Sequence, residues 1–301
     1  MSVVTRPSPP SADPKGTGLT EASHNGSGAE RPLPAAPAWG SRTWIMGILN
    51  VTPDSFSDGG RHDAPEAAEK RALALEAEGA DWIDLGAASS RPGAEAVAET
   101  EELRRLLPAL ERVRAACRRP LSVDTEKASV ARAALAAGAA WVNDIRGLQG
   151  DPRMADVIAS AGAGVVIMHS QSGTEYPGGL MPDLCRFFER SLHLAQRAGI
   201  SRERIVLDPG IGFGKTAAQS LAVLRALPEL RTFGLPLLIG ASRKSVIGRV
   251  LDLPVGERLE GSLATTVVAI AGGADAVRVH DVQPHVRAAR MADAVYRFSH
   301  G

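Results

Sequence analysis

The segment AAGAAWVNDI (136–145) contains the pattern that decides the fold. Its alanines end a helical stretch, and Gly138 stands where a left-handed residue commonly caps a helix. The apolar run that follows, AWVNDI, is continuous, as is typical of a parallel strand covered on both faces. Asn143 and Asp144 place polar side chains at the end of this run. The segment therefore predicts a helix, a glycine turn and a buried parallel strand with polar groups at its carboxyl end.

The same pattern recurs along the chain from Trp44 onward. The apolar runs are WIMGILN (44–50), DWIDLG (81–86), PLSVDT (120–125), AWVNDI (140–145), GVVIMHS (164–170), RIVLDPG (204–210), LPLLIGASRKS (235–245) and DAVRVHD (275–281). Helical stretches such as 65–78 and 99–117 separate them, and glycine turns follow helices at Gly79, Gly138 and Gly273. Eight such units in about 260 residues match the size of a closed barrel. We therefore predict an α/β fold, a single-domain (β/α)8 TIM-type barrel.

The alternative architecture is an open, doubly wound sheet. Such a sheet normally has fewer strands, or carries a G-x-G-x-x-G turn after its first strand. The first run here continues into NVTPDSFSDGG (50–60), which does not match that fingerprint. The barrel is therefore the preferred prediction.

Composition limits the classes of partner. The 301 residues carry 34 basic and 34 acidic side chains, a balance that gives no indication of a nucleic-acid or membrane surface. Cys117 and Cys185 are the only cysteines, too few for a disulfide framework, and the N-terminus lacks a signal-peptide pattern. We expect a cytoplasmic protein that binds neither nucleic acid nor membrane. Residues 1–39 are rich in Pro, Gly, Ala and Ser and predict a disordered tail, which leaves 40–301 for the barrel.

Polar side chains stand at or near the end of every predicted strand. In a barrel these ends converge on one mouth, where active sites are built. The candidates are Asn50, Asp84, Asp124, Asn143, Asp144, His169, Asp208, Arg243, Lys244, Arg278, His280 and Asp281. Any one of the Asp or Asn residues could be a helix cap. Lysine and arginine are poor caps, and the set as a whole therefore favours a binding site.

The chemistry of this set suggests its ligands. Carboxylates and amides suit the paired donors and acceptors of a heterocycle edge, and cationic side chains suit a phosphate-type group. Asn50 offers a neutral oxygen to a hard cation such as Mg²⁺. The first group comprises Asp124, Asn143 and Asp208, and the second Lys244, Arg278 and His280. The mouth is therefore predicted to hold a flat, hydrogen-bonding ring that carries a phosphate or pyrophosphate.

The glycine-rich segment DPGIGFGKT (208–216) needs a separate interpretation. It resembles a Walker A loop at its GKT end, but Pro209 occupies the place of the first required glycine, and the dinucleotide spacing is also missing. We interpret it as a turn that lets the backbone approach a ligand closely, with Phe213 over the mouth. Met46, Met168 and Trp82 lie inside apolar runs and are expected to pack in the core.

Seven blocks of sequence, in order, resemble those of the dihydropteroate synthases. They are MGILNVTPDSFSDGG (46–60), SSRPGA (89–94), SVDT (122–125), NDIRG (143–147), LDPGIGFGK (207–215), SRKS (242–245) and RVHD (278–281). The resemblance covers residues 44 to 295. It implies a folate-pathway transferase that condenses 6-hydroxymethyl-7,8-dihydropterin pyrophosphate with 4-aminobenzoate to give 7,8-dihydropteroate and pyrophosphate. It also implies Mg²⁺, a sulfonamide target and a homodimer, to which the helix around 261–273 could contribute.

The resemblance assigns roles to matching positions. Pterin binding falls to Asp84, Asp124, Asn143, Met168, Asp208 and Lys244, and pyrophosphate binding to Asn50, Arg278 and His280, with Mg²⁺ at Asn50. Aminobenzoate binding falls to Phe56, Ser90, Arg91, Pro92, Phe213 and Ser245. The residues expected to act in catalysis are Asp58, Arg91, Asp124, Lys244, Arg278 and His280. No protein nucleophile is required, because loss of pyrophosphate from an electron-rich pterin can pass through a cation-like state.

The chain departs from the family in its second loop. Ala88 replaces a common Glu and Ser90 a common Thr, and the SQSGTEYPGG segment (170–179) after His169 lacks the usual Gln-Gly-x-Pro register. These changes affect aminobenzoate affinity and sulfonamide sensitivity more than pterin binding. Two alternatives follow: a non-catalytic pterin-binding paralogue, and a methyltetrahydrofolate-binding methyltransferase domain. The TPDSFSDGG and SRPG loops argue against the second alternative.

Overall fold

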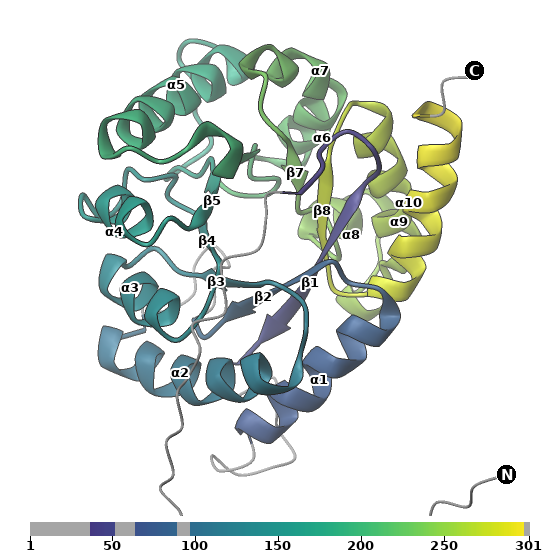
Figure 1. Cartoon of the computed structure of the whole chain (residues 1–301). Coiled ribbons are helices and arrows are strands. Elements are labelled where there is room, and N and C mark those ends of the chain that lie inside the picture. Colours follow the sequence, from purple (N-terminus) through teal and green to yellow (C-terminus); the bar gives the residue numbers. More distant parts are fainter. Residues whose placement is uncertain (1–36, 52–63, 89–96, 298–301) are drawn as a thin grey trace, which may run out of the picture. The chain divides into compact units, whose positions relative to one another are not determined.

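Eight parallel strands form the centre of the structure (Figure 1). The structure is a computed structural model that describes residues 37–51, 64–88 and 97–297. The strands are β1 (Trp44–Asn50), β2 (Trp82–Gly86), β3 (Leu121–Asp124), β4 (Trp141–Asp144), β5 (Gly164–Met168), β6 (Ile205–Asp208), β7 (Leu238–Ile239) and β8 (Ala276–Val279). Each lies within one of the apolar runs of the sequence. Seven strands are buried along almost their whole length, as expected of parallel strands covered on both faces.

The strands pair in the order β6-β5-β4-β3-β2-β1-β8-β7. The strands β6 and β7 stand at the two ends of this order. A parallel bridge between Leu207 of β6 and Leu237, next to β7, joins them, and Leu207 N donates to Pro236 O at 2.9 Å. The prediction of a (β/α)8 TIM-type barrel is therefore confirmed. The parallel register brings all eight carboxyl ends to the same side of the barrel.

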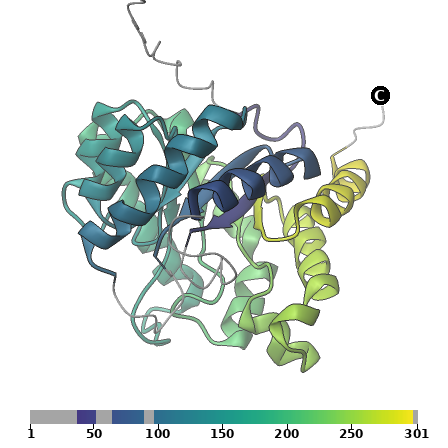
Figure 2. The same cartoon turned by 90° about the horizontal axis from the view of Figure 1, so that it is seen from below.

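Helices surround the strands on the outside of the barrel (Figure 1). They are α1 (Ala64–Glu78), α2 (Glu99–Ala116), α3 (Ala128–Ala136), α4 (Met154–Ser160), α5 (Leu180–Ala198), α6 (Ala217–Arg225), α7 (Leu227–Leu230), α8 (Ser245–Leu251), α9 (Leu259–Ala271) and α10 (Val282–Tyr296). Neighbouring helices such as α1 and α2 pack side by side along the barrel wall (Figure 2). Among the described residues, none of these helices combines the length and apolar character that a membrane span requires.

Glycine turns return the chain from helix to strand at the predicted positions. Gly79, Gly138 and Gly273 have φ values of +102°, +100° and +93°, a region that residues with a side chain rarely adopt. In each case the next residues enter a buried strand. The prediction that glycine ends these helices is confirmed.

Tryptophans fill the amino-terminal end of the barrel. Trp82 and Trp141, the first residues of β2 and β4, meet edge to face with their ring centroids 5.0 Å apart. Trp39 packs at 5.9 Å against both Trp44 and Trp82, so the packed region begins before residue 40. Met46, which the sequence predicts to lie in the core, is fully buried beside these tryptophans. The polar chemistry is therefore left to the opposite, carboxyl-terminal end.

Candidate active site

The carboxyl ends of the strands bring together the polar residues predicted from the sequence. Asn50, Asp124 and Asp208 are the last residues of their strands, and Asp84, Asn143 and Arg278 lie within β2, β4 and β8. Met168 ends β5 and pairs in register with Asp208. Lys244 precedes α8, and His280 follows β8. The residues predicted to bind the pterin and the pyrophosphate thus lie together at one end of the barrel.

Arg278 forms the centre of a buried network across the mouth. Its Nε donates to Oδ2 of Asp84 at 2.7 Å, and its Nη2 donates to Oδ2 of Asp124 at 2.8 Å. Burial alone would lower the pKa of Arg278, but the charges of Asp84 and Asp124 raise it above its ordinary value. The sequence did not predict this pairing, because it assigned Arg278 to the pyrophosphate and the two aspartates to the pterin.

Two acceptor atoms in this network have no hydrogen-bond partner among the residues that the structure describes. Asn143 Nδ2 donates to Asp84 Oδ2 at 3.3 Å, while Oδ1 of Asp84 and Oδ1 of Asn143 are buried and unpaired. A buried acceptor without a partner costs about 1–3 kcal/mol, which a ligand donor would recover. These atoms are therefore suited to N–H groups on the edge of a ring.

Lys244 and Asp208 face each other across Gly240. A methyl group at Gly240 would lie 3.7 Å from Lys244 Nζ, 3.8 Å from Asp208 Oδ2 and 3.8 Å from Arg278 Cβ. Burial lowers the pKa of Lys244 to about 8, opposed by the charge of Asp208. Burial also raises the pKa of Asp208, opposed by Lys244 and by the N–H of Gly210, which donates to Asp208 Oδ1 at 2.7 Å. The missing side chain at Gly240 leaves this space between an ammonium and a carboxylate.

A second glycine creates a similar space on the other side of the mouth. A methyl group at Gly86 would lie 3.8 Å from Asn50 Oδ1 and 3.8 Å from Asp124 Oδ2. Asn50 is exposed, whereas Asp124 is buried. This space therefore lies between two oxygen atoms that could face a cation or a phosphate-bearing ligand.

The glycine-rich segment 210–214 forms a tight turn above β6. Gly210, Gly212 and Gly214 have φ values of +68°, +82° and +61°. A methyl group at Gly210 would lie 1.9 Å from the carbonyl oxygen of His169. The close approach predicted for this backbone is thus made to the neighbouring strand end. Phe213 is half-buried, and Lys244 Nζ lies 4.5 Å from its ring centroid.

His280 is oriented by a serine that the sequence did not single out. Ser242 Oγ accepts a hydrogen bond from His280 N at 3.2 Å and lies 3.1 Å from His280 Nδ1. Oγ accepts from the backbone, and when it donates its own hydrogen to Nδ1, the proton of a neutral His280 lies on Nε2. The SRKS block therefore contributes Ser242 as well as Lys244.

Three of the strand-end residues have structural roles. Asp144 accepts from the backbone N–H groups of Arg146 at 2.9 Å and Leu148 at 2.6 Å, and burial raises its pKa to about 6. Arg243 makes two hydrogen bonds to Asp281, one of them from Nε at 2.8 Å, and joins the two loops. These contacts within the protein account for Asp144, Arg243 and Asp281 at the strand ends, and no ligand is needed to explain them.

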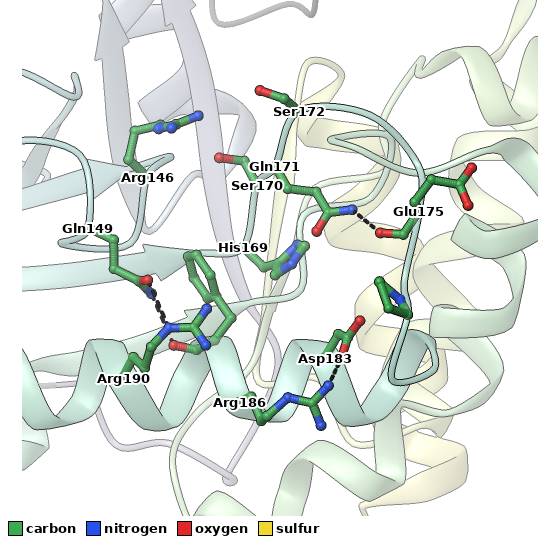
Figure 3. A pocket seen from close by; sticks show the side chains of 12 residues that line it. Arg146, Gln149, His169, Ser170, Gln171, Ser172, Glu175, Asp183, Arg186 and Arg190 are labelled. Carbon is green, nitrogen blue, oxygen red and sulfur yellow. Dashed lines mark hydrogen bonds and ion pairs between the residues drawn. The ribbon is translucent and has the colours of Figure 1, made fainter.

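A pocket of about 440 Å³ lies on the rim beside this mouth (Figure 3). Its lining includes His169 and three arginines, Arg146, Arg186 and Arg190. Arg186 pairs with Asp183, and Arg190 Nε donates to Gln149 Oε1 at 3.2 Å. Of the predicted pterin, pyrophosphate and aminobenzoate residues that the structure describes, none lines this pocket.

The predicted aminobenzoate site is only partly described. Phe56, Asp58, Ser90, Arg91 and Pro92 lie outside the described residues. Ser245 is the exposed first residue of α8, and Ala88 is half-buried beyond β2.

Comparison with known proteins identifies the family. The model of the pterin binding enzymes matches residues 46–280. A dihydropteroate synthase from Synechocystis is 47% identical over 88% of this chain and 96% of its own. A Clostridium difficile dihydropteroate synthase solved with pteroic acid is 50% identical, with a TM-score of 0.85 over 87% of this chain and 99% of its own. A Xanthomonas albilineans dihydropteroate synthase solved with 4-aminobenzoic acid is 43% identical, with a TM-score of 0.82 over 86% of this chain and 94% of its own. With its barrel, its strand-end chemistry and these relatives, the chain belongs to the dihydropteroate synthases.

Proposed function

We propose that the barrel mouth of this dihydropteroate synthase condenses 6-hydroxymethyl-7,8-dihydropterin pyrophosphate with 4-aminobenzoate, giving 7,8-dihydropteroate and pyrophosphate. The observation that carries the assignment of the site is the pair of unpartnered acceptors, Asp84 Oδ1 and Asn143 Oδ1. An aminopyrimidinone edge presents N–H donors side by side, which matches two buried acceptors. The pteroic acid and 4-aminobenzoic acid in the solved relatives support this choice of ligands.

The pterin would lie between the two halves of the mouth. Asp84 and Asn143 would accept from its amino-pyrimidinone edge, and Asp208 would accept from a second ring N–H. Lys244 would donate to a ring acceptor, because its ammonium faces Asp208 across the space at Gly240. Met168, buried at the end of β5, would contact the flat face of the ring.

The pyrophosphate would lie toward Asn50, Arg278 and His280. The hydrogen bonds of Arg278 to Asp84 and Asp124 use Nε and Nη2, which leaves the Nη1 donors for a phosphate oxygen. Nε2 of His280, which carries a proton when Ser242 donates to Nδ1, would donate to a second oxygen. The guanidinium of Arg278 would thus contact both the departing pyrophosphate and the aspartates proposed to bind the pterin.

A magnesium ion fits this site as a companion of the pyrophosphate. Within the described residues, no group of three or more His, Cys, Asp or Glu side chains could hold a metal. Asn50 Oδ1 and Asp124 Oδ2 face the space at Gly86, and Mg²⁺ commonly takes one or two protein oxygens, waters and substrate phosphates. Asn50 would hold the ion, which would supply neutralisation of the developing charge on the leaving group.

The residues of the chain would lower the barrier by stabilising charge. The bond between the pterin methylene carbon and the pyrophosphate oxygen breaks, and its electron pair leaves with the oxygen. Arg278 and His280 stabilise that charge, while Asp84 and Asp208 stabilise the pterin cation. The arylamine nitrogen then bonds to the methylene carbon and gives up one proton to solvent or pyrophosphate. Neither step needs a protein nucleophile.

The aminobenzoate would lie against Phe213 and Ser245, together with Phe56, Asp58, Ser90, Arg91 and Pro92 from the first two loops. Sulfonamides would compete for the same place. The cytoplasm is the compartment that we propose, which agrees with Cys117 and Cys185 both being free thiols.

A homodimer is also part of the proposal. Apolar side chains of α8 and α9 are exposed, with 59% of Val250, 45% of Leu251 and 48% of Val268 accessible. A second copy of the chain would cover them. Sedimentation would show a dimer whose dissociation constant rises in Val268→Asp.

The activity is tested by pyrophosphate release from both substrates with Mg²⁺. Wild-type protein should release pyrophosphate and form dihydropteroate, whereas Lys244→Ala should release at least about a hundredfold less. Release by the wild type that is no faster than by Lys244→Ala would overturn the proposal.

A further inference from the structure

A second lysine, Lys215, lies beneath the mouth with only 7% of its surface accessible. Its Nζ lies 2.8 Å from Nδ1 of His169, 3.0 Å from the carbonyl oxygen of Gly210 and 3.1 Å from that of Phe213. No described carboxylate lies within hydrogen-bonding distance of it. An ammonium group has three donors, and all three acceptors here are neutral. Lys215 is therefore fully hydrogen-bonded without an ion pair.

Placing a buried amine in this position is energetically costly. Burial, opposed by the charge of Asp208 and assisted by that of Lys244, lowers the pKa of Lys215 to about 7. Burial and the charge of Lys215 lower the pKa of His169 to about 3. His169 is therefore neutral and accepts at Nδ1, which places its proton on Nε2. A methionine would fill the same volume without this cost, so the amine is expected to have a function.

Two of the three hydrogen bonds of Lys215 hold the turn at 210–214, those to Gly210 O and Phe213 O. Gly210 O accepts from both Phe213 N, at 3.1 Å, and Lys215 Nζ. Lys244 Nζ donates to Ile211 O at 2.6 Å from the mouth side. Tyr176 Oη donates to Gly214 O at 2.8 Å. Four carbonyl groups of the turn are thus held by side chains, two of them by Lys215.

The turn determines where the Phe213 ring lies. Its glycines adopt left-handed φ values and would permit many other conformations if the side-chain bonds were absent. With the bonds present, the ring lies 4.5 Å from Lys244 Nζ, at the border between the proposed pterin and aminobenzoate positions.

We propose that Lys215 is a positioning residue, which clamps the turn at Gly210 and Phe213 so that the Phe213 ring forms a preorganised wall of the aminobenzoate site. This inference rests on the proposed function and identifies what prepares the site for its second substrate. Lys215 would not touch either substrate.

The test compares Lys215→Met with Lys215→Arg and with Lys70→Met, an exposed lysine of α1. Lys215→Met should raise KM for 4-aminobenzoate at least about tenfold and change Kd for the pterin pyrophosphate less than about threefold. Lys215→Arg keeps the charge, but its planar donors cannot meet three converging acceptors, and an intermediate KM is expected. Lys70→Met should match the wild type. Equal losses for both substrates, or an unchanged aminobenzoate KM, would overturn the proposal.

A second measurement does not depend on activity. Without substrates, amide hydrogen exchange in the peptide 207–216 should be faster in Lys215→Met than in wild type, while the strands keep their protection. Unchanged exchange would overturn the clamp. If the wild type made no dihydropteroate, the proposed function would fail while this measurement would still decide whether Lys215 orders the turn. If Lys215→Met did not fold, the same comparison would be made with Lys215→Arg.

Discussion

Arg278 donates a hydrogen bond of 2.7 Å to Asp84, a carboxylate that has no exposed surface. The two residues lie 194 positions apart, and β1 separates their strands in the barrel. The same guanidinium reaches Asp124. Arg278, which is proposed to bind the leaving group, is therefore also the counter-ion of Asp84 and Asp124, the two carboxylates proposed to bind the pterin. Under the proposed function, binding of the ring and departure of the pyrophosphate would be coupled through this one side chain.

Replacing Arg278 with Ala should lower turnover more than pterin affinity, because the guanidinium acts mainly on charge that develops in the transition state. We expect kcat to fall about 10²- to 10³-fold, and Kd for the pterin pyrophosphate to rise less than about tenfold. Steady-state kinetics and calorimetry would measure the two effects. Equal losses would contradict the assigned role.

The same variant should unfold more easily. Removal of one partner from a buried ion pair typically costs about 3–5 kcal/mol, and Asp84 and Asp124 would both lose a partner. Urea unfolding would measure the change, with Arg186→Ala on the exposed face of α5 as the control. A loss no larger than that of Arg186→Ala would show that the network does not support the fold.

Gly86→Ala should impair catalysis without harming the fold. The added methyl group would meet its neighbours at 3.5–3.8 Å, which is ordinary van der Waals contact. It would nevertheless occupy the space between Asn50 and Asp124, where the leaving group and Mg²⁺ are proposed to lie. We expect kcat/KM to fall at least about tenfold with little change in Tm. Gly256→Ala is the matched control, because no atom of the described residues lies within 4 Å of its added methyl group.

The pH profile should reflect Lys244. Its folded-state pKa of about 8 lies below its ordinary value, so the ammonium proposed to bind the pterin loses its proton as pH rises through 8. We expect kcat/KM for the pterin substrate to fall above this pH. In Lys244→Arg the fall should disappear, because an arginine stays charged. Persistence of the same alkaline limb in that variant would assign it to another group.

The stability of the protein should change in the opposite direction over the same range. A lysine whose pKa is lowered by folding binds more protons in the unfolded state, and stability therefore rises with pH between about 8 and 10.5. Lys244→Met should make that rise smaller, and the rise that remains is that of Lys215, whose pKa burial also lowers, to about 7. Urea unfolding at several pH values would measure it, and an identical slope in both proteins would contradict the burial argument.

Ser242→Ala should reduce turnover through His280. Without the hydroxyl, the imidazole loses the partner at Nδ1 that orients Nε2 toward the proposed pyrophosphate position. We expect kcat to fall about tenfold with a smaller change in pterin affinity. Ser172→Ala on the exposed rim is the control. A change confined to pterin affinity would show that Ser242 acts on a different substrate group.

The sequence was sufficient to predict the strands and the mouth, because continuous apolar runs and their polar ends follow local rules. It overestimated β7: the run 235–245 contains only the two-residue strand Leu238–Ile239, since Pro236 has no N–H to donate to a ladder. The pairing of Arg278 with Asp84 and Asp124 could not be predicted, because it joins side chains of strands that are close in the barrel but not directly hydrogen-bonded to each other. Lys215 was also missed as a functional residue. Its motif resembles a phosphate-binding loop, and only burial shows that its amine points into the protein.

Calorimetric titration of 6-hydroxymethyl-7,8-dihydropterin pyrophosphate, with Mg²⁺, into the wild type and Asn143→Leu tests the placement of the pterin most directly. Leucine keeps a similar volume and removes the buried acceptor Oδ1 together with the Nδ2 donor to Asp84. The wild type should bind one pterin per chain, and Asn143→Leu should bind it at least about tenfold more weakly. Equal affinity in the two folded proteins would contradict the placement of the pterin at the strand ends.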